Sequence, residues 1–281
     1  MMDAIYSAMD VLLPFSWASH GFMKNAFLAV LLVTPLFGLL STMVVSNRMA
    51  FFSDSLGHGA FTGIAIGVLL GIFSPMVSLV AFSVLFALFI TYVKSKSRAS
   101  TDTIIGVFSS TAIALGLMLM SYGGNFNKFS SYLIGDLLSI APEDLAALSC
   151  VFLMVLVAWV FLFNRLLVLS VNASFARSRG ISSFWVESAF AALLAVVVSI
   201  SIQWVGILII NSLLVLPAAG ARNVTNHVKS YHLVSVLIAM VSGISGLIFA
   251  YYWNMAAGAT IVVIASMLFF LTLFLKPYFY E

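Results

Sequence analysis

Charged residues are scarce in this sequence. Only 7% of the 281 residues are charged, with twelve Lys and Arg and nine Asp and Glu. A soluble globular domain carries about 25% charged residues, so an ordinary soluble fold is excluded. The 63% hydrophobic content instead predicts a helical protein that crosses a membrane several times. A net charge of +3 is too small to indicate a nucleic-acid partner.

Cysteine and the common catalytic motifs are also missing. The single cysteine, Cys150, excludes a disulfide framework, and its apolar surroundings predict a buried, inert thiol. The chain has no G-x-x-x-x-G-K-[ST] phosphate loop, no H-E-x-x-H zinc motif and no G-x-S-x-G elbow. We therefore expect no catalytic residues, no enzyme activity and no permanently bound cofactor. The acidic start, with Asp3 and Asp10, also predicts no cleavable signal peptide.

Long apolar runs dominate what is present. Nine of them approach the roughly 20 residues that a bilayer requires. They cover about 26–45, 51–70, 75–93, 103–121, 144–164, 184–203, 205–221, 232–252 and 258–275. Only a turn near Gln203–Trp204 separates the sixth run from the seventh, so eight spans are the alternative. The fold class expected is an all-α transmembrane bundle of eight or nine spans.

Basic residues mark the sidedness of this bundle. Ten of the twelve Lys and Arg fall in alternate connections, and only Lys24 and Lys128 fall on the other side. Because cytoplasmic loops are enriched in Lys and Arg, we predict a multi-pass protein of the plasma or inner membrane. Its N-terminus lies outside and its C-terminus lies in the cytoplasm.

Three connections between the predicted spans are candidate docking sites for partner proteins. The external loop 122–143 ends in Pro142 and two acids, which favour a helix start. The internal connection 165–183 contains an Asn172–Ala173–Ser174 turn followed by a basic helical turn. A second internal loop, 217–232, begins at the helix-breaking Pro217 and is short and basic. Basic internal loops are either topology signals or docking sites.

One apolar run carries the chemistry. In DSLGHGAFTGIAIGVLLG (54–71), Asp54 and His58 are four residues apart and share one face of a helix. Carboxylate and imidazole are suitable ligands for Zn²⁺ and Mn²⁺. Two ligands are too few for a tight site, but a conduit must hold its ion weakly. The alternative is a structural pair in which His58 donates to Asp54.

Glycines recur every four residues beside this pair. Gly59, Gly63, Gly67 and Gly71 form a row that lets another helix approach closely. The sequence therefore predicts a tightly packed helix with one polar spot, and we interpret the spot as a transient site for a divalent metal ion that crosses the membrane.

Five stretches stand out in order along the chain: NRMAFFSDSLGHGAFTGIAIGVLLG (47–71), TDTIIGVFSSTAIALGLML (101–119), YLIGDLLSIAPEDL (132–145), FARSRGI (175–181) and VGILIINSLLVLPAAGAR (205–222). Together they resemble the membrane permease subunits of zinc and manganese ABC importers. The resemblance implies a single permease domain over residues 1–281 with the type II ABC importer permease fold. It also implies that Asp54 and His58 line the path of the ion.

The same resemblance implies partners. Two copies of the chain would form a homodimer around a central pathway. Two cytoplasmic ATP-binding cassette subunits would grip the coupling loop 217–232 with help from 172–182, and an external solute-binding protein would deliver the metal. No nucleic acid is expected.

Three functions remain open at this point. The first is the permease of an ATP-driven importer, with zinc as the first candidate and manganese or iron as alternatives. The second is an ATP-independent metal channel or secondary transporter, which requires further intramembrane acids or broken helices. The third is a structural membrane component in which Asp54 and His58 only stabilise packing.

Overall fold

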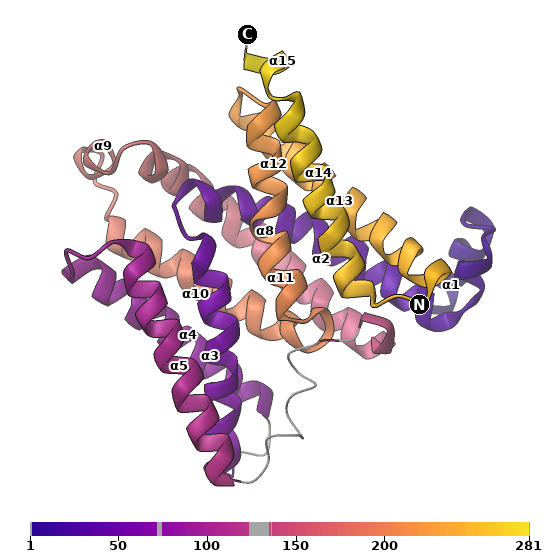
Figure 1. Cartoon of the computed structure of the whole chain (residues 1–281), viewed down its shortest axis with the longest axis horizontal. Coiled ribbons are helices and arrows are strands. Elements are labelled where there is room, and N and C mark those ends of the chain that lie inside the picture. The colour runs from indigo at the N-terminus through magenta and orange to yellow at the C-terminus, as the bar shows by residue number, and fades with distance from the viewer. Residues whose placement is uncertain (1, 72–74, 124–134, 136, 281) are drawn as a thin grey trace. The chain divides into compact units, whose positions relative to one another are not determined.

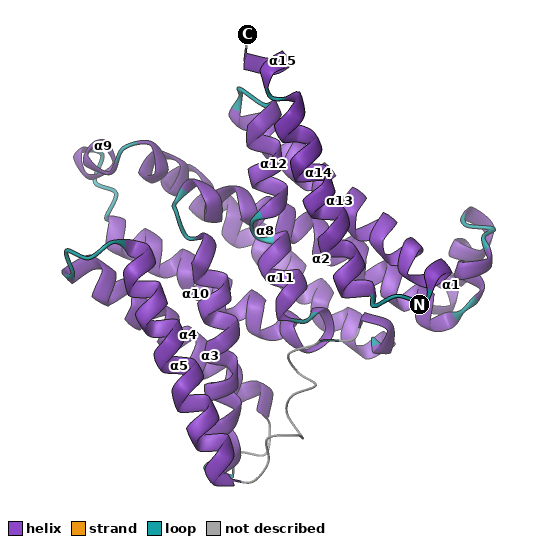
Figure 2. Cartoon of the chain, in the orientation of Figure 1, coloured by secondary structure: helices purple, strands orange, loops and turns teal. Residues whose placement is uncertain are grey.

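Helices make up the described chain. The computed structural model describes residues 2–71, 75–123, 135 and 137–280, and these contain helices and connecting loops but no strand (Figure 2). The long helices are α2 (Gly21–Ser46), α3 (Ala50–Leu69), α4 (Pro75–Lys96), α5 (Thr101–Gly123), α8 (Pro142–Val171), α10 (Ser183–Val205), α13 (Val228–Trp253) and α14 (Ala257–Leu275). The all-α prediction is confirmed for this part of the chain.

Shorter helices connect or flank the long ones. They are α1 (Met2–Leu12), α9 (Ala173–Ser178), α11 (Ile207–Leu213), α12 (Leu216–Val224) and α15 (Pro277–Tyr280), with 3₁₀ turns at Ser16–Ser19 and Leu137–Ser139. The chain divides into two units, one of residues 1–42, 135–154 and 204–281, the other of 43–134 and 155–203. Each unit is described by itself.

In the first unit, α12, α13 and α14 pack against one another, and α11 packs on α14 (Figure 1). Small residues make these approaches close. A Cβ on Gly246 of α13 would lie 2.7 Å from the Cα of Ile261 on α14. A Cβ on Gly38 of α2 would lie 2.9 Å from the Cα of Val236 on α13. These backbones therefore pack at distances that only glycine permits.

In the second unit, α3 packs against both α4 and α5 (Figure 1). The glycine row predicted from the sequence is the surface that meets α4. A Cβ on Gly63 would lie 3.2 Å from the Cα of Leu79, and a Cβ on Gly67 would lie 2.6 Å from the Cβ of Ser78. On the α5 side, the Thr62 hydroxyl donates to the carbonyl oxygen of Ala112 at 2.5 Å. The prediction of a close helix neighbour is confirmed for Gly59, Gly63 and Gly67, whereas a Cβ on Gly71 would meet no atom of the described residues within 4 Å.

The predicted spans coincide with helices, with one exception. The seventh run, 205–221, is split into α11 and α12, which meet at Leu214–Val215. The turn expected near Gln203–Trp204 lies at Gly206, whose φ of 79° only glycine adopts without strain. Seven helices of the described residues are long and apolar enough to cross a membrane. The total of eight or nine spans stays a prediction.

One predicted helix start is confirmed, and the turn expected at Asn172–Ala173–Ser174 is instead the start of a helix. Pro142 opens α8, and the Asp144 carboxylate accepts a hydrogen bond from the backbone N–H of Ala141 at 3.0 Å. The Asn172 side chain caps α9 by accepting from the backbone N–H groups of Ser174 and Phe175 at 2.9 and 3.0 Å. Most of the external loop 122–143, namely 124–134 and 136, lies outside the described residues.

Two expectations require correction. Residues 217–224 are helical and belong to α12, which buries Pro217, Ala218, Gly220 and Ala221 against α13 and α14; only Thr225, Asn226 and His227 connect α12 to α13. The loop expected over 217–232 is therefore three residues long, because proline is accommodated in the first turn of a helix. Cys150 is exposed on α8 and is not a buried thiol.

Candidate metal path on helix α3

The turn between α2 and α3 sets the residue at which α3 begins, and so where the polar residues of α3 lie. Arg48, between α2 and α3, has a φ of 57°, in the left-handed region that closes helix C-termini. Its backbone N–H donates to the Val45 carbonyl oxygen at 3.2 Å, and that of Met49 donates to Val44 at 2.8 Å. With the last carbonyl groups of α2 satisfied in this way, α3 begins at Ala50.

Asp54 and His58 meet as the spacing predicts. The His58 Nε2 lies 3.4 Å from the Asp54 Oδ2, and the two side chains are 33% and 45% exposed respectively. At that distance the imidazole and the carboxylate form an ion pair when His58 is protonated. Partial exposure leaves both groups within reach of an ion that approaches this face of α3.

The pair lies in the first half of α3, not at its centre. Asp54 is the fifth and His58 the ninth of the twenty residues of α3. At a rise of 1.5 Å per residue, they lie roughly 6 and 12 Å from the start of the helix. The pair therefore occupies the end of α3 near Arg48, which the basic-residue pattern predicts to be cytoplasmic.

The surroundings of α3 leave one face of this segment open. Gly59 lies beside the ring of Phe86 on α4, while Phe51, which precedes Asp54 by three residues, is 62% exposed. The Ser55 side chain is fully buried, and its hydroxyl oxygen has no hydrogen-bond partner. The exposed face that carries Phe51, Asp54 and His58 is thus separate from the glycine face that packs on α4.

This donor set is sparse. The described residues contain no group of three or more His, Cys, Asp or Glu side chains close enough to hold a metal ion. Zinc in a structural site takes four protein ligands. Asp54 and His58 of one chain supply two, so a full coordination shell requires water or ligands from a further chain. The described residues of one chain therefore do not form a closed four-ligand site.

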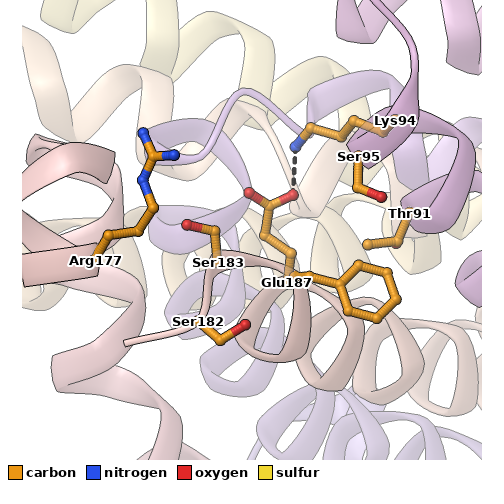
Figure 3. Close-up of a pocket in the computed structure, with 8 residues that line it drawn as sticks. Thr91, Lys94, Ser95, Arg177, Ser182, Ser183 and Glu187 are labelled. Carbon is orange, nitrogen blue, oxygen red and sulfur yellow. Dashed lines mark hydrogen bonds and ion pairs between the residues drawn. The ribbon is translucent and has the colours of Figure 1, made fainter. Parts of the chain in front are cut away.

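A second polar cluster was missed in the sequence. The Lys94 Nζ lies 2.7 Å from the Glu187 Oε2, beside a cavity of about 430 Å³ (Figure 3). The cavity is lined by Thr91, Lys94, Ser95, Arg177, Ser182, Ser183, Phe184 and Glu187. Glu187, near the start of α10, pairs with a lysine of α4. These residues come from separate segments of the chain, so their spacing in the sequence does not indicate that they lie together.

Comparison with known proteins identifies relatives. The ABC 3 transport family matches residues 19–276. The chain is 31% identical over 236 residues to the high-affinity zinc uptake system membrane protein ZnuB of Haemophilus influenzae, covering 84% of this chain and 90% of that protein. It is 27% identical over 258 residues to the manganese transport system membrane protein MntC of Listeria innocua, covering 92% of each.

Solved structures share the fold. The chain superposes on PsaBC from Streptococcus pneumoniae, solved in complex with Fab, with a TM-score of 0.80 and 26% identity over 99% of this chain and 97% of that one. An inward-facing putative metal-chelate type ABC transporter matches with a TM-score of 0.70 at 16% identity, over 90% of this chain and 85% of that one, which shows the fold alone.

Proposed function

Because this chain belongs to the ABC 3 transport family, we propose that it is the permease subunit of an ATP-driven importer of divalent metal ions, with zinc as the first candidate cargo. The observation that carries the proposal is the family match, which extends over almost the whole chain. The relatives named above are zinc and manganese uptake proteins. The helical, multi-pass fold agrees with this role.

Asp54 and His58 are the proposed contacts of the ion. They offer one carboxylate and one imidazole on an accessible face of α3, and both ligand types bind Zn²⁺ and Mn²⁺. A homodimer that brings two copies of this face to a shared path would offer two nitrogens and two carboxylates. Since geometry and metal supply decide between such ions, manganese and iron remain alternative cargoes.

The energy for transport comes, in this proposal, from two copies of a separate ATPase. In this chain, the proposed docking surface for the ATPase consists of the exposed parts of the predicted cytoplasmic connections. In 171–180 every side chain except Ala176 is exposed, including Arg177 and Arg179. In 217–232 the exposed part begins only at Arg222, because α12 is buried before it. We therefore assign the larger share of ATPase contact to 172–182. An external solute-binding protein would supply the metal.

Uptake measurements test the role of the pair. The chain, reconstituted in vesicles with its ATPase and binding protein, is supplied with Zn²⁺, Mn²⁺ or Fe²⁺ and the internal metal is counted. Asp54→Asn and His58→Gln preserve side-chain size while weakening the ligands, and each is expected to reduce uptake at least about tenfold. Asp102→Asn, an exposed acid at the start of α5, is the matched control and retains uptake.

Each result has a defined meaning. Normal uptake in both α3 variants, with the complex assembled, would assign Asp54 and His58 to packing. Uptake by the chain alone, independent of ATP, would replace the importer with a metal channel or secondary transporter. The ion that the wild-type complex accumulates fastest identifies the cargo.

A further inference from the structure

The cavity beside Lys94 and Glu187 has the features of an anion site. We propose that it binds a phosphate group, as the headgroup of an anionic phospholipid or as free phosphate. The proposal is independent of the metal path, because the cavity contains neither Asp54 nor His58. Arg177 also lies in the surface proposed above for the ATPase, so the site is proposed for the chain without its ATPase.

Charge is the first support. Lys94 and Arg177 bring two positive charges to the cavity and Glu187 brings one negative charge, which leaves a net charge of +1. Figure 3 shows Arg177 and Lys94 on opposite sides of Glu187 and Ser183. Glu187 is occupied by Lys94 at 2.7 Å, so its carboxylate is already neutralised. The Arg177 side chain is exposed, and its planar guanidinium suits the oxygens of a phosphate.

Backbone polarity is the second support. Ser183 is the first residue of α10, a helix of 23 residues, and Ser182 and Phe184 flank it in the cavity wall. The first turn of a helix has N–H groups without intrahelical partners and carries the positive end of the dipole. No acidic residue occupies this first turn. The hydroxyls of Ser182 and Ser183 add donors at the same end, whereas Thr91 and Ser95 donate to carbonyl groups of their own helix.

Size and location complete the case. A volume of about 430 Å³ falls within the range of small-molecule sites, roughly 300–1,000 Å³. Lys94 lies at the end of α4 that the basic-residue pattern predicts to be cytoplasmic. Anionic lipids are concentrated in that leaflet, and basic pockets between helices bind their headgroups. A phosphodiester that carries one negative charge matches the net charge of the cavity.

Native mass spectrometry of the delipidated full chain tests the site. Dioleoyl phosphatidylglycerol, dioleoyl phosphatidylcholine and inorganic phosphate are titrated separately. Wild type is expected to retain one phosphatidylglycerol tightly. Arg177→Gln removes a charged hydrogen-bond donor, and Ser183→Asp replaces a hydroxyl donor with a carboxylate. Each is expected to weaken the retention of phosphatidylglycerol about tenfold or more. Arg179→Gln, which removes a neighbouring charge outside the cavity, is the matched control and retains wild-type binding.

The variants separate the outcomes. Ser183→Asp keeps the Lys94–Glu187 pair and places an acid where the helix dipole favours it, so it folds even if another variant does not. If inorganic phosphate displaces phosphatidylglycerol from wild type but not from the variants, the natural ligand is free phosphate. If the variants lose phosphatidylglycerol and inorganic phosphate does not displace it from wild type, the natural ligand is the lipid. Equal binding of every probe to all four proteins, or no stoichiometric binding to wild type, overturns the proposal.

Discussion

Replacing Gly67 by alanine tests the packing that holds α3 against α4. A Cβ at this position would lie 2.0 Å from the Oγ and 2.6 Å from the Cβ of Ser78 on α4. Neither separation is sterically possible, and the Ser78 Cβ cannot swing away because it is fixed to the α4 backbone. Gly67→Ala therefore forces α3 and α4 apart over this contact.

The expected size follows from two opposing terms. Overpacking of this kind costs about 1–3 kcal/mol, and a contact this short belongs at the upper end. Alanine favours helix over glycine by about 0.8–1.0 kcal/mol. The net loss of unfolding free energy is then about 1–2 kcal/mol. At about 2–4 °C per kcal/mol, the midpoint of thermal unfolding falls by about 2–8 °C.

The assay is thermal unfolding of the detergent-purified chain at one fixed scan rate. Gly106→Ala is the matched control, because a Cβ on Gly106, a helical glycine of α5, would meet no atom of the described residues within 4 Å. It gains the helix preference without the clash, so its midpoint stays level or rises. Gly67→Ala combined with Ser78→Gly restores the space, and the double-mutant cycle is expected to show favourable coupling of about 1–3 kcal/mol. A Gly67→Ala midpoint equal to that of Gly106→Ala would refute the close α3–α4 packing.

Two further predictions concern local structure. Asn172→Ala removes the cap of α9, and we expect this to destabilise that helix by about 1 kcal/mol. Amide hydrogen exchange at Ser174 and Phe175 is then expected to be about fivefold faster, whereas Asn172→Asp keeps the protection. Unchanged exchange in the alanine variant would count against the cap. Asp10→Asn leaves the Lys24 amine, 9% exposed and 2.6 Å from the Asp10 carboxylate, without its charged partner. Because Asp10 is itself 56% exposed, the expected loss of unfolding free energy is only about 1 kcal/mol. Thermal unfolding measures this loss. An equal loss in Asp102→Asn would show that removing any exposed acid has the same effect, and that the Asp10–Lys24 pair is not its cause.

Features set by short-range chemistry could be predicted from the sequence. The start of α8 at Pro142 depends on residues within one helical turn. The cap of α9 by Asn172 is equally local, although the sequence indicated only a turn there. The Asp54–His58 contact depends on i,i+4 spacing alone. The glycine row of α3 predicted a close neighbour, because small residues every four positions have few other uses in a membrane helix.

Features set by the partner of a segment could not be predicted. Pro217 was interpreted as a break between a span and a loop, yet it stands in the first turn of α12, where proline is tolerated. What decides the difference is that α12 buries small residues against α13 and α14, and these helices follow later in the chain. The Lys94–Glu187 pair is similar, since its residues are 93 positions apart.

The contacts within the second unit connect its two polar sites. Arg177 and Glu187 share the cavity wall, and Glu187 pairs with Lys94 at the end of α4. The same α4 meets the glycine row of α3, whose opening turns carry Asp54 and His58. Helix α4 is therefore the element that the two sites share, because it is joined to α10 by the Lys94–Glu187 ion pair and to α3 by the glycine packing.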